Sequence, residues 1–225
     1  MKPTTLFITG TDTGVGKTVL TALLVRYLRR RGIRAAAIKP VCSGGRDDVR
    51  ALHAAMDGVL TLDEINPWHF RAPMAPLLAA RRERRRITPG DVLGLARAVE
   101  KHFDMVLIEG AGGLLSPLGE LFDSRDLIAA LRAVPIIVCP DRLGAVNQVR
   151  LVLAALPPGA SGRARVVLIS PPKPDISTKT NAALLGEFFA AGKISSLPWL
   201  GRRLDWKTAL NNLRVQQALC ALTKI

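Results

Sequence analysis

The chain has 225 residues, 48% of them hydrophobic, and a formal net charge of +14 at pH 7. This length and hydrophobic content exclude a disordered chain and fit one large α/β domain with a substantial core. No apolar run reaches the ~20 residues that span a bilayer, and the start of the chain does not read as a signal peptide, so we expect a cytoplasmic protein without a membrane partner. The spacing of Cys42, Cys139 and Cys220 predicts reduced thiols and no metal site.

Apolar runs alternate with helical periods along the whole chain. We expect strands over residues 5–9, 35–39, 105–109, 135–139, 166–170 and 194–197. We expect helices over residues 17–31, 47–56, 90–101, 124–133, 145–156, 178–190 and 208–222. This alternation predicts an α/β fold with a doubly wound, mainly parallel sheet. The proline-rich loops at residues 157–159 and 171–174 are too short to separate domains, so we expect a single domain over residues 1–225.

A glycine-rich segment at residues 10–18 reads GTDTGVGKT and lies between the first predicted strand and the first predicted helix. This order is the context of a phosphate-binding loop, in which backbone N–H groups and a helix N-terminus converge on anionic oxygens. Lys17 would reach the outer phosphates, and the Thr18 hydroxyl would bind Mg²⁺. Thr11 stands where the generic pattern has its first glycine. The segment predicts a P-loop nucleotide site, with further contacts from Asp12, Thr13, Gly14, Val15 and Gly16.

Charged residues follow two other predicted strands. Lys39 ends the second strand and Glu109 ends the third, and Asp47 and Asp48 open the helix after the loop at residues 40–45. In parallel sheets, ligands bind at the carboxyl ends of the strands, so these side chains should lie beside the phosphate loop. Glu109 stands in a Walker-B-like position as a metal ligand, and Lys39 could stabilise charge on a transferred phosphoryl group.

The densest basic segment, residues 81–86, reads RRERRR. It has no interleaved aromatic residues on which bases could stack, and no nucleic-acid-binding module is recognisable. We therefore interpret it as a solvated connection and expect no specific nucleic-acid partner.

Several segments, in chain order, resemble the dethiobiotin synthetase family. They are TGTDTGVGKT at 9–18, KPVCSG at 39–44, NPWHF at 66–70, EGAGG at 109–113, LGAVN at 143–147 and LPWL at 197–200. The family's loop also has Thr at the place of Thr11. Lys-Pro-x-x-Ser-Gly and Glu-Gly-Ala-Gly-Gly together are specific to it.

The resemblance implies an enzyme that closes a cyclic urea on 7,8-diaminononanoate with CO₂, ATP and Mg²⁺, through a phosphorylated carbamate. It implies Lys39 and Lys17 as catalytic residues, and Ser43 and Thr13 as substrate contacts. It implies Thr18, Asp48 and Glu109 as metal ligands, with Asp48 preferred to Asp47 because Asp48 matches the family's Asp-x-x-x-Leu. Asp48 and Glu109 would also contact the nucleotide, and its remaining contacts would be Gly110, Ala111, Gly112, Pro198, Trp199 and Leu200.

The family is a homodimer in which the substrate carboxylate binds a helix N-terminus of the partner chain. The matching segment here is Gly144, Ala145, Val146 and Asn147, and a helix start suits a carboxylate. Two segments depart from the family pattern and leave the choice of base open. Ser170-Pro171-Pro172 replaces the asparagine that contacts adenine, and Gly201-Arg202-Arg203 replaces an acidic loop.

Three other functions fit parts of the pattern. Related enzymes that amidate a corrin ring carry a glutaminase domain, for which 225 residues leave no room. Partitioning-type ATPases have a signature lysine early in the loop, where this chain has Asp12. A paralogous ligase for another amine would share all the motifs above.

Overall fold

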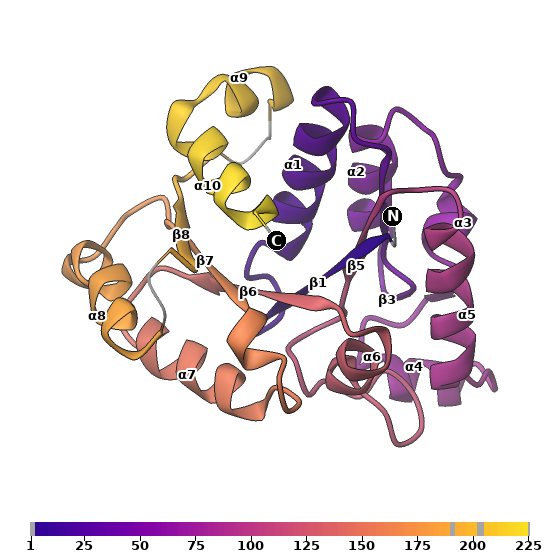
Figure 1. Ribbon diagram of the computed structural model, residues 1–225. Helices are drawn as coiled ribbons and strands as arrows, with labels where there is room; N and C mark the ends of the chain where they lie inside the picture. The colour runs from indigo at the N-terminus through magenta and orange to yellow at the C-terminus, as the bar shows by residue number, and fades with distance from the viewer. Residues whose placement is uncertain (1–2, 190–191, 202–204, 225) are drawn as a thin grey trace.

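The computed structural model describes residues 3–189, 192–201 and 205–224 (Figure 1). Six strands form one sheet in which every neighbouring pair is parallel. Their spatial order is β2 (Ala35–Ile38), β5 (Met105–Glu109), β1 (Thr4–Gly10), β6 (Val134–Pro140), β7 (Arg165–Ile169) and β8 (Ile194–Leu197). The predicted α/β fold with a mainly parallel sheet is confirmed.

Helices cover both faces of this sheet, which explains why its strands are apolar along their length. In Figure 1, one face carries α1 (Lys17–Arg30), α2 (Asp47–Ala55), α9 (Trp206–Asn211) and α10 (Leu213–Thr223). The other face carries α5 (Pro89–Glu100), α6 (Ser124–Leu131), α7 (Ala145–Ala155) and α8 (Asn181–Phe188). Leu6, Phe7 and Ile8 on the central strand β1 are fully buried between the two helical layers.

A small second sheet, which was not predicted from the sequence, lies beside the main one. β3 (Val41–Ser43) pairs in parallel with β4 (Trp68–Phe70), and the buried Asn66 amide fixes the approach by donating to the carbonyl oxygens of Lys39 at 2.8 Å and Pro40 at 3.1 Å. Strands of three residues are too short to show a period. The short helices α3 (Leu62–Ile65) and α4 (Pro76–Arg82) were missed for the same reason.

Two predicted helices are divided in the structure. The helix expected over residues 208–222 is α9 followed by α10, because the Asn212 side chain accepts from the N–H groups of Arg214 and Val215 and caps α10. The helix expected over residues 178–190 is the 3₁₀ turn Ile176–Lys179 followed by α8, and residue 190 lies outside the described residues. A second 3₁₀ turn, Ser161–Arg163, precedes β7.

Candidate active site

The phosphate-binding loop connects β1 to α1 with glycines where the backbone requires them. Gly14 and Gly16 have φ values of 72° and 98°, a region that L residues rarely adopt. A Cβ atom on Gly16 would lie 2.6 Å from Ile169 Cδ1. Because α1 begins after Gly16 without a side-chain cap, the N–H groups of its first turn point out with no side chain to satisfy them. These groups are suited to bind an anionic oxygen.

Lys17 is the first residue of α1, and its ammonium folds back over the loop. Its Nζ donates to the Asp12 carbonyl oxygen at 2.8 Å, and the residue is buried. Burial lowers the pKa of Lys17 to about 8, and the Glu109 carboxylate opposes this shift. A nucleotide phosphate beside Lys17 would favour the charged ammonium.

Lys39 and Glu109 meet at the carboxyl ends of β2 and β5. Glu109 Oε1 accepts from Lys39 Nζ at 2.7 Å and from Thr18 Oγ1 at 2.7 Å. Lys39 Nζ also pairs with the Asp48 carboxylate. Glu109 is 1% exposed, and its Oε2 is a buried oxygen without a hydrogen-bond partner among the described residues. The cluster therefore joins four side chains from four segments of the chain, α1, the end of β2, α2 and β5, around the buried Glu109 carboxylate.

The charges in this cluster stabilise one another. Burial alone would lower the pKa of Lys39, but the Glu109 and Asp48 carboxylates outweigh burial and raise it. Burial would raise the pKa of Asp48, but the neighbouring Lys39 ammonium lowers it. Lys39 is thus a cation and Asp48 an anion at neutral pH.

The structure places the two candidate aspartates differently. Asp48 faces Lys39, whereas the side chain of Asp47 is 93% exposed and pairs with Arg50 at 2.6 Å. Asp48 is therefore the aspartate that shares the cluster with Thr18 and Glu109.

Thr18, Asp48 and Glu109 offer a donor set that fits Mg²⁺. One hydroxyl and two carboxylates are hard oxygen ligands, which Mg²⁺ prefers together with phosphate and water. The unpartnered Oε2 of Glu109 is a buried lone-pair donor of the kind that a cation would satisfy. The residues present are thus suited to hold the metal that the resemblance implies.

A cavity of about 610 Å³ opens beside the cluster. Six of the predicted residues for substrate and nucleotide line it, of which four are Thr13, Lys39, Ser43 and Asp48. Ala111 and Gly112 line it as well, directly after the strand that carries Glu109. The Ser43 hydroxyl is held in place because it donates to the Met74 carbonyl oxygen at 2.6 Å.

The sequence analysis missed the apolar wall of this cavity. It is formed by Pro73, Met74, Ala75 and Pro76, which lead into α4, and by Pro117 beyond Ser116. The prolines at 73 and 76 restrict the backbone of this segment and are visible in the sequence, but only the fold shows that the segment faces Lys39.

Other predicted site residues lie elsewhere at the same edge of the sheet. Gly144, Ala145, Val146 and Asn147 begin α7 after β6, and none of them is among the residues lining the 610 Å³ cavity. Trp199 and Leu200 line a separate cavity of about 220 Å³ together with Asp205, Thr208 and Asn212. Pro198 follows β8, and Arg202 and Arg203 lie outside the described residues.

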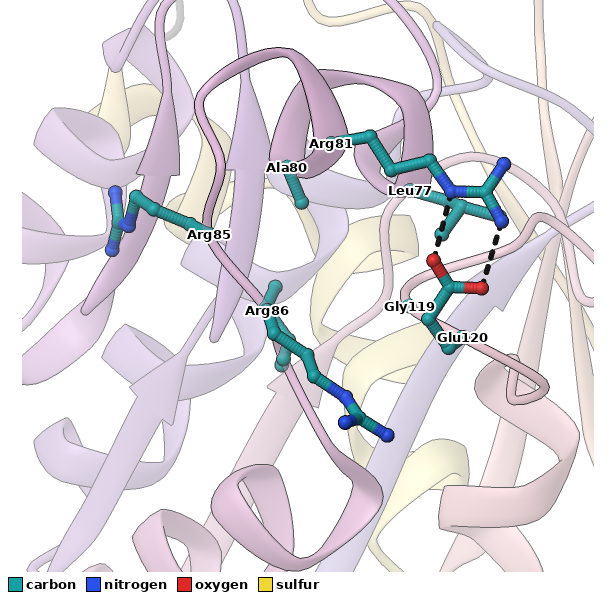
Figure 2. Close-up of a pocket in the computed structure, with 8 residues that line it drawn as sticks. Leu77, Ala80, Arg81, Arg85, Arg86, Gly119 and Glu120 are labelled. Carbon is teal, nitrogen blue, oxygen red and sulfur yellow. Dashed lines mark hydrogen bonds and ion pairs between the residues drawn. The ribbon is translucent and has the colours of Figure 1, made fainter.

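The arginine-rich segment after α4 does not converge on one point. Figure 2 shows Arg81 paired with Glu120, while the guanidinium groups of Arg85 and Arg86 point away from that pair and from each other. Both contacts from Arg81 to Glu120 measure 2.8 Å. Arg85 lies over the Phe70 ring at 5.0 Å and donates to the His69 carbonyl oxygen at 2.9 Å. Two of these arginines are thus used in internal contacts.

Among the described residues, no helix is both long enough and apolar enough to cross a membrane. The three cysteines are free thiols.

Comparison with solved structures finds chains of similar fold. The MinC:MinD cell division complex of Aquifex aeolicus matches with a TM-score of 0.60 at 14% identity, covering 97% of this chain and 93% of that one. A ParA family ATPase from Chlorobium tepidum TLS matches with a TM-score of 0.58 at 13% identity, covering 99% of this chain and 100% of that one. Identities this low support the fold alone.

Sequence comparison gives the family. A family model described as an AAA domain matches residues 4–212. The ATP-dependent dethiobiotin synthetase BioD of Anaeromyxobacter dehalogenans strain 2CP-C is 40% identical over 199 residues, covering 86% of this chain and 89% of the relative. The protein of the same name from Anaeromyxobacter sp. strain Fw109-5 is 44% identical over 155 residues, covering 67% of this chain and 70% of the relative. With this identity along most of its length, the chain belongs to the ATP-dependent dethiobiotin synthetase family.

Proposed function

We propose that this protein is an ATP-dependent dethiobiotin synthetase, which closes a cyclic urea on 7,8-diaminononanoate using CO₂ and ATP. The observation that carries the proposal is the ion pair between Lys39 and Glu109, which lies between the phosphate-binding loop and the 610 Å³ cavity. A cation at this position faces the nucleotide on one side and a bound substrate on the other.

The nucleotide would bind along the loop at residues 12–18, with its outer phosphates on the first turn of α1 and on Lys17. Thr18, Asp48 and Glu109 would hold Mg²⁺. When bound, this ion would neutralise part of the negative charge on the phosphates. Ion pairing of Lys39 with two of these ligands holds both carboxylates in place before a nucleotide arrives.

The first stage prepares an activated carbonyl carbon. One amine of the substrate adds to CO₂ and loses a proton, which gives a carbamate. A carbamate oxygen attacks the γ-phosphorus of ATP while the bond from that phosphorus to the bridging oxygen breaks, so ADP leaves. Lys17 and Lys39 stabilise the charge that spreads over the transferred phosphoryl group, in a site that largely excludes water.

The second stage closes the ring. The second amine attacks the carbonyl carbon, and the bond from that carbon to the phosphorylated oxygen breaks. Phosphate leaves, and the attacking amine loses one proton. The second amine must be held next to the carbonyl carbon that the first amine already carries, so the site has to position the substrate for ring closure. Thr13 and Ser43 supply hydroxyls on the cavity wall, and Pro73, Met74 and Pro117 supply an apolar surface for the alkyl chain.

The substrate carboxylate would bind at the N-terminus of α7 in a partner subunit of a homodimer. Gly144 is the N-cap of α7 and has no side chain to satisfy the first N–H groups of the helix. Apolar side chains lie exposed near this element, with Leu143 82% exposed and Leu151 62% exposed. Leu151 lines a groove with Thr11, Asp12 and Leu115, next to the phosphate-binding loop, where a second copy could cover it.

A substrate assay tests the proposed function. The protein is incubated with ATP, Mg²⁺, bicarbonate and 7,8-diaminononanoate, and mass spectrometry is used to detect dethiobiotin and ADP formed in equal amounts. Omission of ATP and the variant Lys17→Ala are the negative controls. ATP hydrolysis without ring closure would contradict the proposal, and ring closure of a diamine without a carboxylate at equal efficiency would favour a ligase for another amine.

A further inference from the structure

The loop that leads into α7 is held by a network of polar side chains from a distant part of the chain. The Asn181 amide Nδ2 donates to Asp141 Oδ1 at 2.8 Å and to the Arg142 carbonyl oxygen at 3.1 Å. Asp175 Oδ2 accepts from the backbone N–H of Leu143 at 3.0 Å. Three consecutive residues before Gly144 are thus fixed by two side chains that lie 32 to 40 residues away in sequence.

This network is built to hold a fixed position. Asn181 and Asp141 are both buried, at 5% and 3% exposure. Asp175 is itself held, because its Oδ1 accepts from Ser177 N–H at 2.8 Å and from the Ser177 hydroxyl at 2.5 Å. The Asn181 amide also reaches the Ser177 hydroxyl at 3.3 Å, which joins the two clamps. The Asn181 and Asp141 pair is buried and Asp175 is exposed, so the network restrains the loop from a buried clamp at Asp141 and from a surface clamp at Leu143.

The geometry of α7 makes that restraint important for binding. Gly144 adopts φ 91° and brings no side-chain cap, so the direction of the first N–H groups of α7 depends on the loop before it. The Arg142 carbonyl oxygen that Asn181 contacts also accepts from Ala145 N–H at 3.0 Å, the first residue of the helix. The network therefore reaches the helix start through one shared carbonyl.

We propose that Asp175 and Asn181 are positioning residues that set the α7 N-terminus for the substrate carboxylate. This inference rests on the proposed function, because it assigns the network a role in binding the diamine. Neither residue lines the cavity beside Lys39, so both act through the Leu143 and Arg142 backbone and not by contact with ATP or the reacting atoms.

The test compares Asp175→Ala with Asp175→Asn in the full-length enzyme. Asp175→Ala removes the acceptor for Leu143 N–H, and the KM for diaminononanoate should rise about tenfold, the effect of one lost hydrogen bond, while kcat and the KM for ATP stay within about twofold. Asp175→Asn keeps one acceptor oxygen for the two N–H groups of Leu143 and Ser177, and should restore part of the affinity. Asp91→Ala is the matched control, because Asp91 also caps a helix but belongs to α5.

A second measurement does not depend on turnover. Hydrogen–deuterium exchange in a peptide covering residues 141–148 should be faster in Asp175→Ala than in wild type and intermediate in Asp175→Asn. Asn181→Leu, which keeps the branched shape but loses the amide, should show the same change. An unchanged diamine KM and unchanged exchange in an active Asp175→Ala variant would overturn the inference. A wild-type protein that makes no ring-closed product would overturn the proposed function instead, so the two failures are distinguishable.

Discussion

Lys39 Nζ lies 2.7 Å from Glu109 Oε1, although the two residues are 70 positions apart in the chain. The pairing register of β2 and β5 brings the two residues close, because Ile38, the last residue of β2, stands opposite Ile108, and Lys39 and Glu109 are the residues that follow them. The ion pair is therefore a direct product of parallel strand pairing at the edge of the sheet where ligands bind.

Replacing each lysine should separate chemistry from nucleotide binding. Lys39→Ala and Lys17→Ala should each lower turnover by roughly 10²–10³-fold, the loss expected for one transition-state donor. Lys39→Ala should bind a fluorescent ATP analogue nearly as well as wild type, because Lys39 is not part of the loop, whereas Lys17→Ala should bind it weakly. Wild-type turnover in Lys39→Ala would remove this residue from the mechanism.

The two adjacent aspartates provide a matched pair for the metal. Asp48→Asn should weaken Mn²⁺ binding in the presence of ADP, because it removes one of the carboxylates that face Lys39 and Thr18. Asp47→Asn should leave Mn²⁺ binding unchanged, because that carboxylate is exposed and pairs with Arg50. Electron paramagnetic resonance of free Mn²⁺ measures both, and a larger loss in Asp47→Asn would reverse the assignment.

In the absence of nucleotide, the Lys39 ammonium and a divalent cation should compete for the carboxylates of Asp48 and Glu109. The Lys39 ammonium pairs with both the Asp48 and the Glu109 carboxylates and offsets part of their charge, so Lys39→Met should bind Mn²⁺ roughly tenfold or more tightly than wild type while losing activity. Arg50→Met is the control, since it removes a cation from Asp47 only. Equal Mn²⁺ affinity in Lys39→Met and wild type would show that the ion pair does not occupy the metal site.

Adding a negative charge at the start of α7 tests whether this helix binds the substrate carboxylate in a site shared between two subunits. Ala145 is fully buried, so substitution there would perturb packing, whereas Asn147 is exposed on the first turn. Asn147→Glu should favour the helix, because an acidic residue suits its N-terminus, yet raise the diamine KM roughly tenfold by repelling the carboxylate. Asn147→Gln should retain wild-type KM, and the KM for ATP should change little in either variant.

Mixing Asn147→Glu with Lys39→Ala should then restore part of the activity, because a mixed dimer contains one site with both parts intact. No restoration despite subunit exchange, or a fully active monomer, would rule out a site shared between subunits.

The contact between Arg81 and Glu120 should make a small pH-dependent contribution to stability. A hydrogen bond from Arg81 lowers the pKa of Glu120, so the folded protein holds this carboxylate ionised more strongly than the unfolded chain does. The contribution is present above the ordinary carboxyl pKa of about 4.3 and disappears as the pH falls through the lower folded value. The difference in melting temperature between wild type and Glu120→Gln should therefore be largest at pH 7 and should shrink toward zero in acid.

The control for this measurement is Glu187→Gln, which removes an exposed carboxylate on α8. A gap between wild type and Glu120→Gln that persists at pH 3 would show that packing of the loop, and not the ion pair, is responsible.

The sequence predicted those parts of the fold and site that follow from local patterns. The glycine loop, the alternation of strands with helices and the charged residues at strand ends all have a local signature, and they place Lys17, Thr18, Lys39 and Glu109 at one edge of the sheet. The choice of Asp48 came from resemblance to a family, since the sequence pattern alone allowed either aspartate.

The parts that were missed depend on contacts between distant segments. β3 and β4 are stabilised by each other and by the Asn66 amide, so neither is recognisable alone. The apolar wall at Pro73 and Met74 faces Lys39 only because α4 packs beside β3. The clamp from Asp175 to Leu143 N–H joins two loops, and nothing in either loop by itself indicates the other.

An isotope experiment tests the central claim most directly. Wild-type protein is mixed with C¹⁸O₂, ATP, Mg²⁺ and 7,8-diaminononanoate, and the products are analysed by mass spectrometry before the label exchanges with water. Phosphorylation of a carbamate oxygen predicts that the released phosphate carries a single ¹⁸O atom and that the urea carbonyl of dethiobiotin carries the other. Phosphate without label would mean that water, and not a carbamate, attacks ATP, and would contradict the account.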